Sequence, residues 1–265
     1  VILLSATLPA QARQRMLAAY DAQCDAATVT QAPTAYPAIH WRSGQGMGTV
    51  HLPPEKGRQV KLERISYNEG AVVSLLTERL AEGGCAAVIC NTVARAQSVY
   101  VALREAALVD SDDLTLFHAR YPYAWRQATE QRVLERFGKR RVRAAKERAV
   151  VVATQVIEQS LDLDFDYVVT DMAPIDLLIQ RAGRLHRHTR GGAQRPAALR
   201  TPRLAITVPA EEDGLPAWES DGYVYAPYVL LRSLLALKGL ESLDLPRDTA
   251  HLISAVYDPW PELPE

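Results

Sequence analysis

The feature that most constrains the fold is a repeated alternation of short apolar runs with longer segments of helical periodicity. The apolar runs are rich in Val and Ile without strict alternation, and they lie at residues 1–5, 60–65, 86–91, 114–118, 149–154, 167–171 and 204–208. Helices are expected at residues 10–20, 69–81, 94–107, 124–137 and 175–184. Strands that are apolar on both faces and separated by helices predict an α/β fold: a parallel β-sheet with helices on both faces.

The composition indicates a globular protein. The chain has 265 residues, of which 48% are hydrophobic and 23% are charged, so it can fill a core and is unlike a disordered, collagen-like or coiled-coil chain. Cys24, Cys85 and Cys90 form no CxxC pair, which favours buried thiols in a reducing compartment and gives no zinc site. Without a bilayer-length apolar run or a basic leader, we expect a cytoplasmic protein with no membrane association.

The charge is unevenly distributed along the chain, although the formal net charge is only −1. Residues 1–210 carry 27 basic and 20 acidic side chains, whereas residues 211–265 carry 3 basic and 11 acidic ones. A basic body of this kind indicates a polyanionic partner.

Three segments suggest how the chain is divided. The apolar run at residues 1–5 has no Met before it and is typical of a buried strand, so we expect a fragment whose upstream sheet partners lie elsewhere. Residues 30–58 hold four prolines and the glycine stretch 44–48, which predicts a linker with a flexible loop rather than a phosphate-binding loop. Residues 209–222 form a second break before a helix at 225–237, whose wide apolar face is expected to pack on a neighbouring domain.

The most informative segment for function is rich in arginine. Residues 177–210 contain seven arginines and no acid, and four of the arginines recur at every third position: Arg181, Arg184, Arg187 and Arg190. Stacking like charges on one helical ridge is unfavourable, and Gly183 inside a helix costs about 1 kcal/mol relative to Ala. A segment that accepts both costs is expected to bind an anion, because guanidinium groups suit phosphate oxygens. A solvated basic face is the alternative.

A second candidate segment follows the strand at 149–154. Its polar turn is suited to contact a sugar-phosphate chain through Thr154 and a ribose hydroxyl through Asp162. A calcium loop is rejected, because Tyr167 and Ala173 stand where Gly and Glu are needed. The neighbouring carboxylates are expected at a strand edge or turn; they are Asp164 and Asp166.

Smaller features have two interpretations each. Ser5 and Thr7 follow the first apolar run, where hydroxyl groups also cap helices. His118 is as consistent with a structural histidine as with a site residue, and His186 and His188 lack the neighbours of a metal ligand. The basic run at residues 139–148 predicts either a DNA-facing patch or a solvated loop.

Together and in this order, the segments resemble motifs of superfamily 2 helicases. Residues 5–7 resemble motif III, 88–92 motif IV, 154–162 motif V and 180–187 motif VI. Further similarity, to the signature helicase–nuclease of type I CRISPR systems, lies in residues 116–121, 134–139 and 155–162. The resemblance implies a RecA-like sheet. Residues 1–58 would then be the end of a first RecA-like domain with a linker, 59–210 the second RecA-like domain, and 211–265 an acidic helical accessory segment.

The resemblance also implies roles in an ATP-dependent 3′-to-5′ single-strand DNA translocase. Arg184 and Arg187 would be arginine fingers on the γ-phosphate of ATP, bound with Mg²⁺ mainly by the missing first motor domain. Asp162, Gln180 and Arg181 would serve the nucleotide site, with Arg181 more typically paired with a carboxylate. Backbone contacts to single-stranded DNA are implied for Asn91, Thr92, Thr154 and Gln155, and coupling of nucleotide state to domain closure for Ser5 and Thr7. The partners implied are an RNA-guided surveillance complex and upstream RecA-like and nuclease domains.

Missing motifs limit what the chain does alone. It has no GxxxxGK[ST] loop, no Walker B Asp-Glu pair and no nuclease His-Asp cluster, so we expect neither ATP hydrolysis nor DNA cleavage from it in isolation. Two alternatives remain open: a different superfamily 2 helicase acting on DNA or RNA, and a non-catalytic nucleic-acid-binding module.

Overall fold

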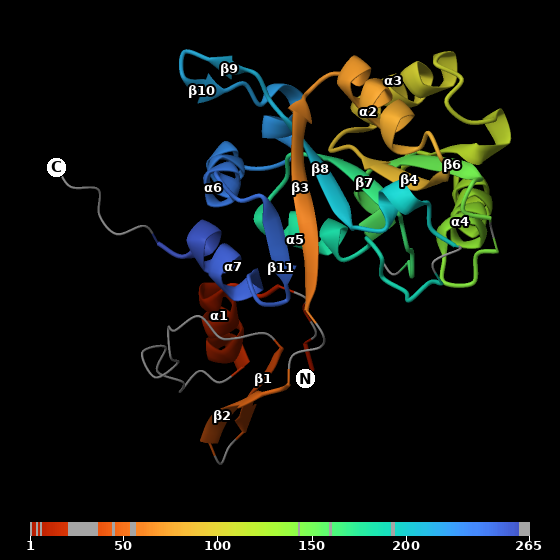
Figure 1. The fold of residues 1–265 in the computed structure, drawn as a ribbon. Helices are drawn as coiled ribbons and strands as arrows, with labels where there is room; N and C mark the ends of the chain where they lie inside the picture. Colours follow the sequence, from red (N-terminus) through yellow and green to blue (C-terminus); the bar gives the residue numbers. More distant parts are fainter. Residues whose placement is uncertain are drawn as a thin grey trace.

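A seven-stranded β-sheet lies at the centre of the computed structural model, which describes residues 2, 3, 5, 7–20, 37–43, 46–53, 57–142, 144–158, 161–191 and 194–259. The strand order is β11-β3-β8-β7-β4-β6-β5, and every neighbouring pair is parallel except β11 with β3 (Figure 1). The strands are β3 (Arg58–Ser66), β4 (Gly84–Ile89), β5 (Leu114–Phe117), β6 (Arg148–Ala153), β7 (Tyr167–Asp171), β8 (Arg203–Val208) and β11 (Ser242–Leu245).

The central strand β4 explains why the sheet is covered on both faces. All six of its residues are buried. Cys85, Ala87 and Ile89 pack into one hydrophobic core, whereas Ala86 and Val88 pack into the other. Because successive side chains of a strand point to opposite faces, a strand without polar positions needs a helix layer on each side.

The helices form those two layers. One face carries α2 (Glu69–Arg79) and α3 (Val93–Glu105); the opposite core takes side chains from α4 (Tyr123–Phe137), α5 (Ile175–Ala182), α6 (Pro227–Leu237) and α7 (Thr249–Tyr257). The predicted α/β fold is therefore confirmed. The six predicted strands from residue 60 to 208 are found as β3 to β8, and the predicted helices are found, with ends that agree within two residues. Among the described residues, no helix combines the length and apolar character needed for a membrane span.

The described residues of the run at 1–5 do not form the predicted strand, whose sheet partners were expected outside this sequence. Ile2 and Leu3 are 87% and 65% exposed and lie outside any strand. A strand needs a hydrogen-bonded neighbour, and the described part of this chain places none beside them. The helix expected next is present as α1 (Ala10–Tyr20). Cys24 lies outside the described residues.

The segment expected to be a linker contains a β-hairpin. β1 (Ala38–Ser43) and β2 (Gly46–His51) pair antiparallel, while the loop residues 44 and 45 lie outside the described residues. Gly48 allows the Trp41 ring to lie against its strand partner, because a Cβ there would stand 2.7 Å from the ring. The hairpin contacts α1 through Arg13 and His40, whose Nη1 and Nε2 atoms are 3.1 Å apart.

The acidic C-terminal segment completes the sheet and one helix layer. β11 extends the sheet as an antiparallel edge strand beside β3, and α7 packs on α6. The apolar face of α6 is buried within this chain through Leu230 and Leu237, next to Leu252 and Val256 of α7. α7, which the sequence did not reveal, covers part of α6, while Tyr228 and Leu235 stay exposed, so packing of this helix on a neighbouring domain stays a prediction. Between β8 and α6 lie the short β9 (Glu211–Glu212) and β10 (Leu215–Pro216) and the 3₁₀ helix η5 (Glu219–Tyr223).

Candidate functional site

The carboxyl ends of the central strands bring together the residues predicted from motifs IV and V. Ile89 of β4 is level with Ala153 of β6 and Thr170 of β7. The turn after β4 therefore lies beside the 3₁₀ helix η3 (Gln155–Glu158) that follows β6. Gln155 Nε2 donates a hydrogen bond of 2.8 Å to the carbonyl oxygen of Asn91 and thereby joins the two turns.

Two of the predicted DNA contacts are buried. Asn91 is 3% exposed, and its Nδ2 donates to the Met172 carbonyl at 2.7 Å. Thr154 is 4% exposed. The expectation of direct phosphate contacts is thus not supported for these two side chains, because they fill the space between strand tips. Thr92 is half-buried and caps α3, accepting a 3.1 Å hydrogen bond from the Arg95 amide, as the first turn of a helix requires.

Gln155 is the motif V residue that reaches the C-terminal segment. Its Nε2 is 3.0 Å from the Tyr225 hydroxyl, just before α6. The side chain is half-buried. It therefore links the tip of β6 to the acidic accessory segment, a contact that nothing in the local sequence pattern indicates.

The arginine-rich segment does not form one helical ridge. α5 ends at Ala182, and Gly183 follows as its C-cap. His186 then adopts a left-handed conformation with φ of 47°. Only Arg181 of the four regularly spaced arginines is on the helix, so the expected stacking of like charges is avoided by ending the helix early.

Arg181 is a fully buried brace. Its guanidinium is 0% exposed, with Nε donating to Glu158 Oε1 at 2.7 Å and Nη1 donating to Thr170 Oγ1 at 2.6 Å. These bonds hold η3 and β7 against α5. The expected pairing with a carboxylate is confirmed, and the residue that supplies the carboxylate is Glu158.

Arg184 and Arg187 lie beside the segment that leaves the tip of β6. Arg184 is half-buried and donates to the carbonyls of Leu161 and Glu158, the latter at 2.8 Å. Burial lowers the pKa of Arg184, and the nearby Arg187 adds to the effect. Arg187 is more exposed, and its Nε donates to Asp162 Oδ1 at 2.8 Å.

Asp162 is the carboxylate that pairs with Arg187. It is about half exposed and also lies 3.0 Å from His188 Nε2. Desolvation raises the pKa of this carboxyl, but the hydrogen bonds from Arg187 and His188 outweigh that effect, so the pKa lies below its usual value. Gln180 is half-buried on the last turn of α5. Asp162, Arg184 and Arg187 are thus neighbours, with Arg187 and Asp162 open to solvent.

A buried network of ion pairs holds the residues that follow Asp162, up to the start of β7. Asp164 and Asp166 are 0% and 1% exposed. Asp166 Oδ1 accepts from Arg141 Nη2 at 2.8 Å and from Arg195, and Asp164 accepts from Arg195 Nη2 at 2.8 Å and from Arg190. Although burial opposes it, hydrogen bonds from Arg195 and Arg190 lower the pKa of Asp164.

This network refines two expectations. Asp164 and Asp166 lie in the turn before β7, as expected, and they form the buried centre of the network. In the basic run 139–148, Arg141 is buried in the network while Lys139 and Arg140 stay exposed, so the run is neither wholly a patch nor wholly a solvated loop. Buried charges persist only when they are paired.

Ser5 and Thr7 form a local turn. Ser5 Oγ donates to the Thr7 carbonyl at 2.8 Å and accepts from the Thr7 amide at 3.3 Å. His118 stacks on Tyr121, with ring centroids 4.2 Å apart. His186 Nε2 lies 3.3 Å from the Asp166 carbonyl. Within the described ranges, no group of three His, Cys, Asp or Glu side chains could hold a metal.

A polar cluster missed by sequence reasoning lies at the tips of β3 and β7. The Arg95 guanidinium pairs with Glu69 at 2.7 Å, lies 3.7 Å from Asp171 and stands over the Tyr67 ring at 4.3 Å. Tyr67 Oη is 3.5 Å from Oδ1 of Asp221, which belongs to η5. Burial, and then the nearby Asp171, raise the pKa of Asp221 to about 7.

This shift predicts that stability falls as pH rises from about 4 to 7, because the folded state retains a proton on Asp221 that the unfolded state has lost. Asp221→Asn should therefore stabilise the protein at pH 8 by about 2–4 kcal/mol and have little effect near pH 4. Urea unfolding of both proteins across this range measures the difference. The exposed Asp112→Asn serves as control, and an equal effect of Asp221→Asn at both pH values would contradict the assignment.

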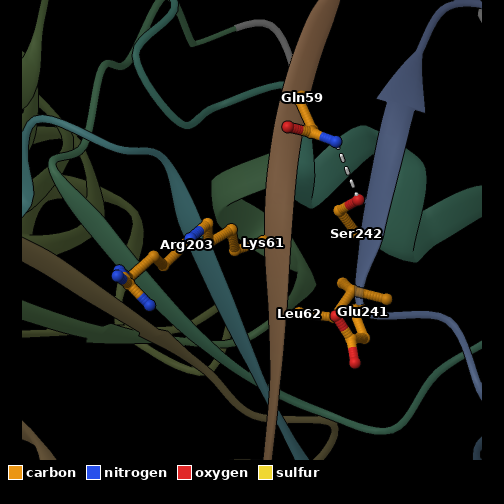
Figure 2. A pocket seen from close by; sticks show the side chains of 6 residues that line it. All are labelled: Gln59, Lys61, Leu62, Arg203, Glu241 and Ser242. Atoms are coloured by element: carbon orange, nitrogen blue, oxygen red, sulfur yellow. Dashed lines mark hydrogen bonds between the residues drawn. The ribbon is translucent and has the colours of Figure 1, made fainter.

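A separate hollow lies at the opposite, amino-terminal end of the strands. It measures about 350 Å³ and is lined by Gln59, Lys61, Leu62, Arg203, Glu241 and Ser242 (Figure 2). Figure 2 shows Gln59 bonded to Ser242 while Lys61 and Arg203 extend away from them. The hollow contains none of the motif residues and is assigned no role in the site.

The sheet order and the arginine-rich segment define a RecA-like helicase domain. A family model described as "CRISPR-associated nuclease/helicase Cas3, C-terminal" matches residues 82–190. The CRISPR-associated endonuclease/helicase Cas3 of Thermus thermophilus is 36% identical over 97% of this chain and 31% of its own length. The chain therefore belongs to the Cas3 family, in its C-terminal helicase part.

Solved structures agree with this assignment. The structure of T. fusca Cas3 with ATP is 34% identical, with a TM-score of 0.80 over 97% of this chain and 32% of that one. A CRISPR RNA-guided surveillance complex, pre-nicking, contains a chain that is 31% identical, with a TM-score of 0.81 over 98% of this chain and 34% of that one. The chain spans less than a third of the length of three curated relatives that it matches.

Proposed function

We propose that this chain is the second motor half of an ATP-dependent single-strand DNA translocase of CRISPR interference. One observation carries the proposal: Arg184, Arg187 and Asp162 lie together beside the segment leaving β6, and Arg181 braces that segment from within through Glu158. The solved ATP complex of a relative supports a nucleotide at this fold. Residues 1–58 would belong to the end of the first motor domain, 59–210 to the second and 211–265 to an accessory segment.

The nucleotide roles follow from the chemistry of the side chains. Arg187 has exposed guanidinium donors and Arg184 stands next to it, so both suit the oxygens of a γ-phosphate. Asp162, now paired with Arg187, would accept from a ribose hydroxyl once Arg187 turns to the phosphate. ATP with Mg²⁺ would be held mainly by the first motor domain, and hydrolysis of ATP would supply the energy for movement. Gln180 would line the site, and Arg181 would act by fixing η3.

Fewer side chains than expected would contact the nucleic acid directly. Thr92 and Gln155 remain candidates for backbone contacts, whereas Asn91 and Thr154 would position the turns that carry them. Contacts of this kind ignore base identity and weaken with salt. Ser5 and Thr7 would couple nucleotide state to closure, and the partners would be an RNA-guided surveillance complex and upstream RecA-like and nuclease domains.

ATP turnover tests the proposal. The complete protein that contains this chain should hydrolyse ATP several-fold faster when single-stranded DNA is added, and the response should decline as salt increases. The 265-residue chain alone should hydrolyse none. A DNA-stimulated rate from the isolated chain, or a complete protein indifferent to DNA, would contradict the assignment.

A further inference from the structure

Two exposed aromatic rings near the tip of β5 have no part in the roles above. Tyr123 and Trp125 belong to the first turn of α4 and are 74% and 67% exposed. The apolar positions that anchor α4 come later, at Val133 and Phe137, so the first turns of the helix extend past the packed core. Two large rings exposed on one helical turn are typical of an interaction surface.

The two rings lie next along the sheet edge after the turns that carry the proposed nucleic-acid contacts. Within the sheet order, β6 lies between β4 and the edge strand β5. Phe117, the last residue of β5, is level with Ala153, and its carbonyl accepts a 3.2 Å hydrogen bond from the Thr154 amide. A strand of DNA that passes the turns after β4 and β6 would next reach the start of α4.

The charge of this surface fits a polyanion. Residues 118–129 include Arg120 and Arg126 but no Asp or Glu, and the first turn of α4 has no acidic residue. Arg120 is exposed. Protein interfaces also favour Tyr, Trp and Arg, but the excess of positive charge and the continuity with Thr154 favour nucleic acid.

Neighbouring side chains order the segment that carries the two rings. His118 is buried and stacks on Tyr121 with an interplanar angle of 9°, just before the helix. Gln127 Nε2 donates to the Tyr123 hydroxyl at 2.9 Å and so fixes the first ring from one helical turn away. Residues two apart on a helix point to different sides, so each ring would meet a different base.

We propose that Tyr123 and Trp125 stack on unpaired bases of single-stranded DNA beyond the tip of β6, with Arg120 and Arg126 near the phosphates. This surface rests on the proposed function and adds base contacts to a site otherwise built from backbone contacts. Stacking tolerates any sequence, because every base has a π-face. Its loss is expected to weaken binding about tenfold per base.

Binding of fluorescent oligothymidine to the complete protein tests the proposal. The double variant Tyr123→Ala, Trp125→Ala should bind about 10- to 100-fold more weakly than the parent. The variant Tyr123→Phe, Trp125→Phe should stay within a few-fold, because the rings are kept. Tyr20→Ala is the control, since Tyr20 is 62% exposed at the end of α1, which lies apart from α4 (Figure 1).

An abasic strand separates stacking from backbone contacts. Removing bases while keeping phosphates should weaken binding to the parent and leave binding to the double alanine variant nearly unchanged. Equal abasic effects on parent and variant would overturn the proposal, as would a variant that binds DNA normally but no longer associates with the surveillance complex. If the parent binds no single-stranded DNA, the proposed function fails together with this inference.

Discussion

Replacing Arg187 with alanine in the complete protein is expected to lower ATP turnover by about 10³-fold while leaving nucleotide binding nearly intact. The guanidinium would stabilise charge that develops on the γ-phosphate in the transition state, so its loss acts on the rate more than on affinity. In this chain Arg187 is exposed and bonds only Asp162 through Nε among the described contacts, so the substitution should leave the fold undisturbed.

Arg184→Ala is expected to lower turnover similarly, but with a structural contribution, because Arg184 also bonds the carbonyls of Leu161 and Glu158. Arg187→Lys should not restore the rate, since lysine lacks the planar fork of donors. Steady-state ATPase assays with saturating single-stranded DNA measure each effect. The exposed Arg104→Ala on α3 is the matched control, and turnover of Arg187→Ala within a few-fold of the parent would refute the role.

Replacing Asp166 with alanine is expected to destabilise the protein by about 3–5 kcal/mol. Its carboxylate accepts from Arg141, Arg195 and the Cys85 amide, and all of these groups are buried. The substitution leaves the buried Arg141 guanidinium without its carboxylate partner, whereas Arg195 keeps Asp164, and the cost of an unpaired buried charge exceeds that of a lost surface contact.

Chemical unfolding, followed by circular dichroism, measures this loss. Asp112→Ala removes an exposed carboxylate from η2 (Ser111–Asp113) and should change stability by less than about 0.5 kcal/mol. If Asp166→Ala cost no more than this control, the network would have to be far better hydrated than its geometry indicates.

The sheet and most helices were predictable because their signals are local. A run such as residues 149–154 is apolar at every position, and the neighbouring helices have their own periodicity, so each element is recognisable without its partners. β11 and the β1–β2 hairpin were not, since four to six residues of mixed polarity become strands only through pairing with a neighbour. The run at residues 1–5 has the apolar character of a strand, but the described chain offers it no neighbour, so its described residues form none.

The residues of the candidate site were likewise predictable only in part. The sequence by itself singled out the side chains that we propose carry the chemistry, because Arg181, Arg184 and Arg187 stand in a regularly spaced, acid-free run. Only the tertiary structure decided what each one does: Arg181 is buried against Glu158, Arg187 reaches solvent beside Asp162, and Asn91 is enclosed. Residue type and spacing are local properties, whereas burial and charge pairing depend on segments distant in the chain that folding brings together.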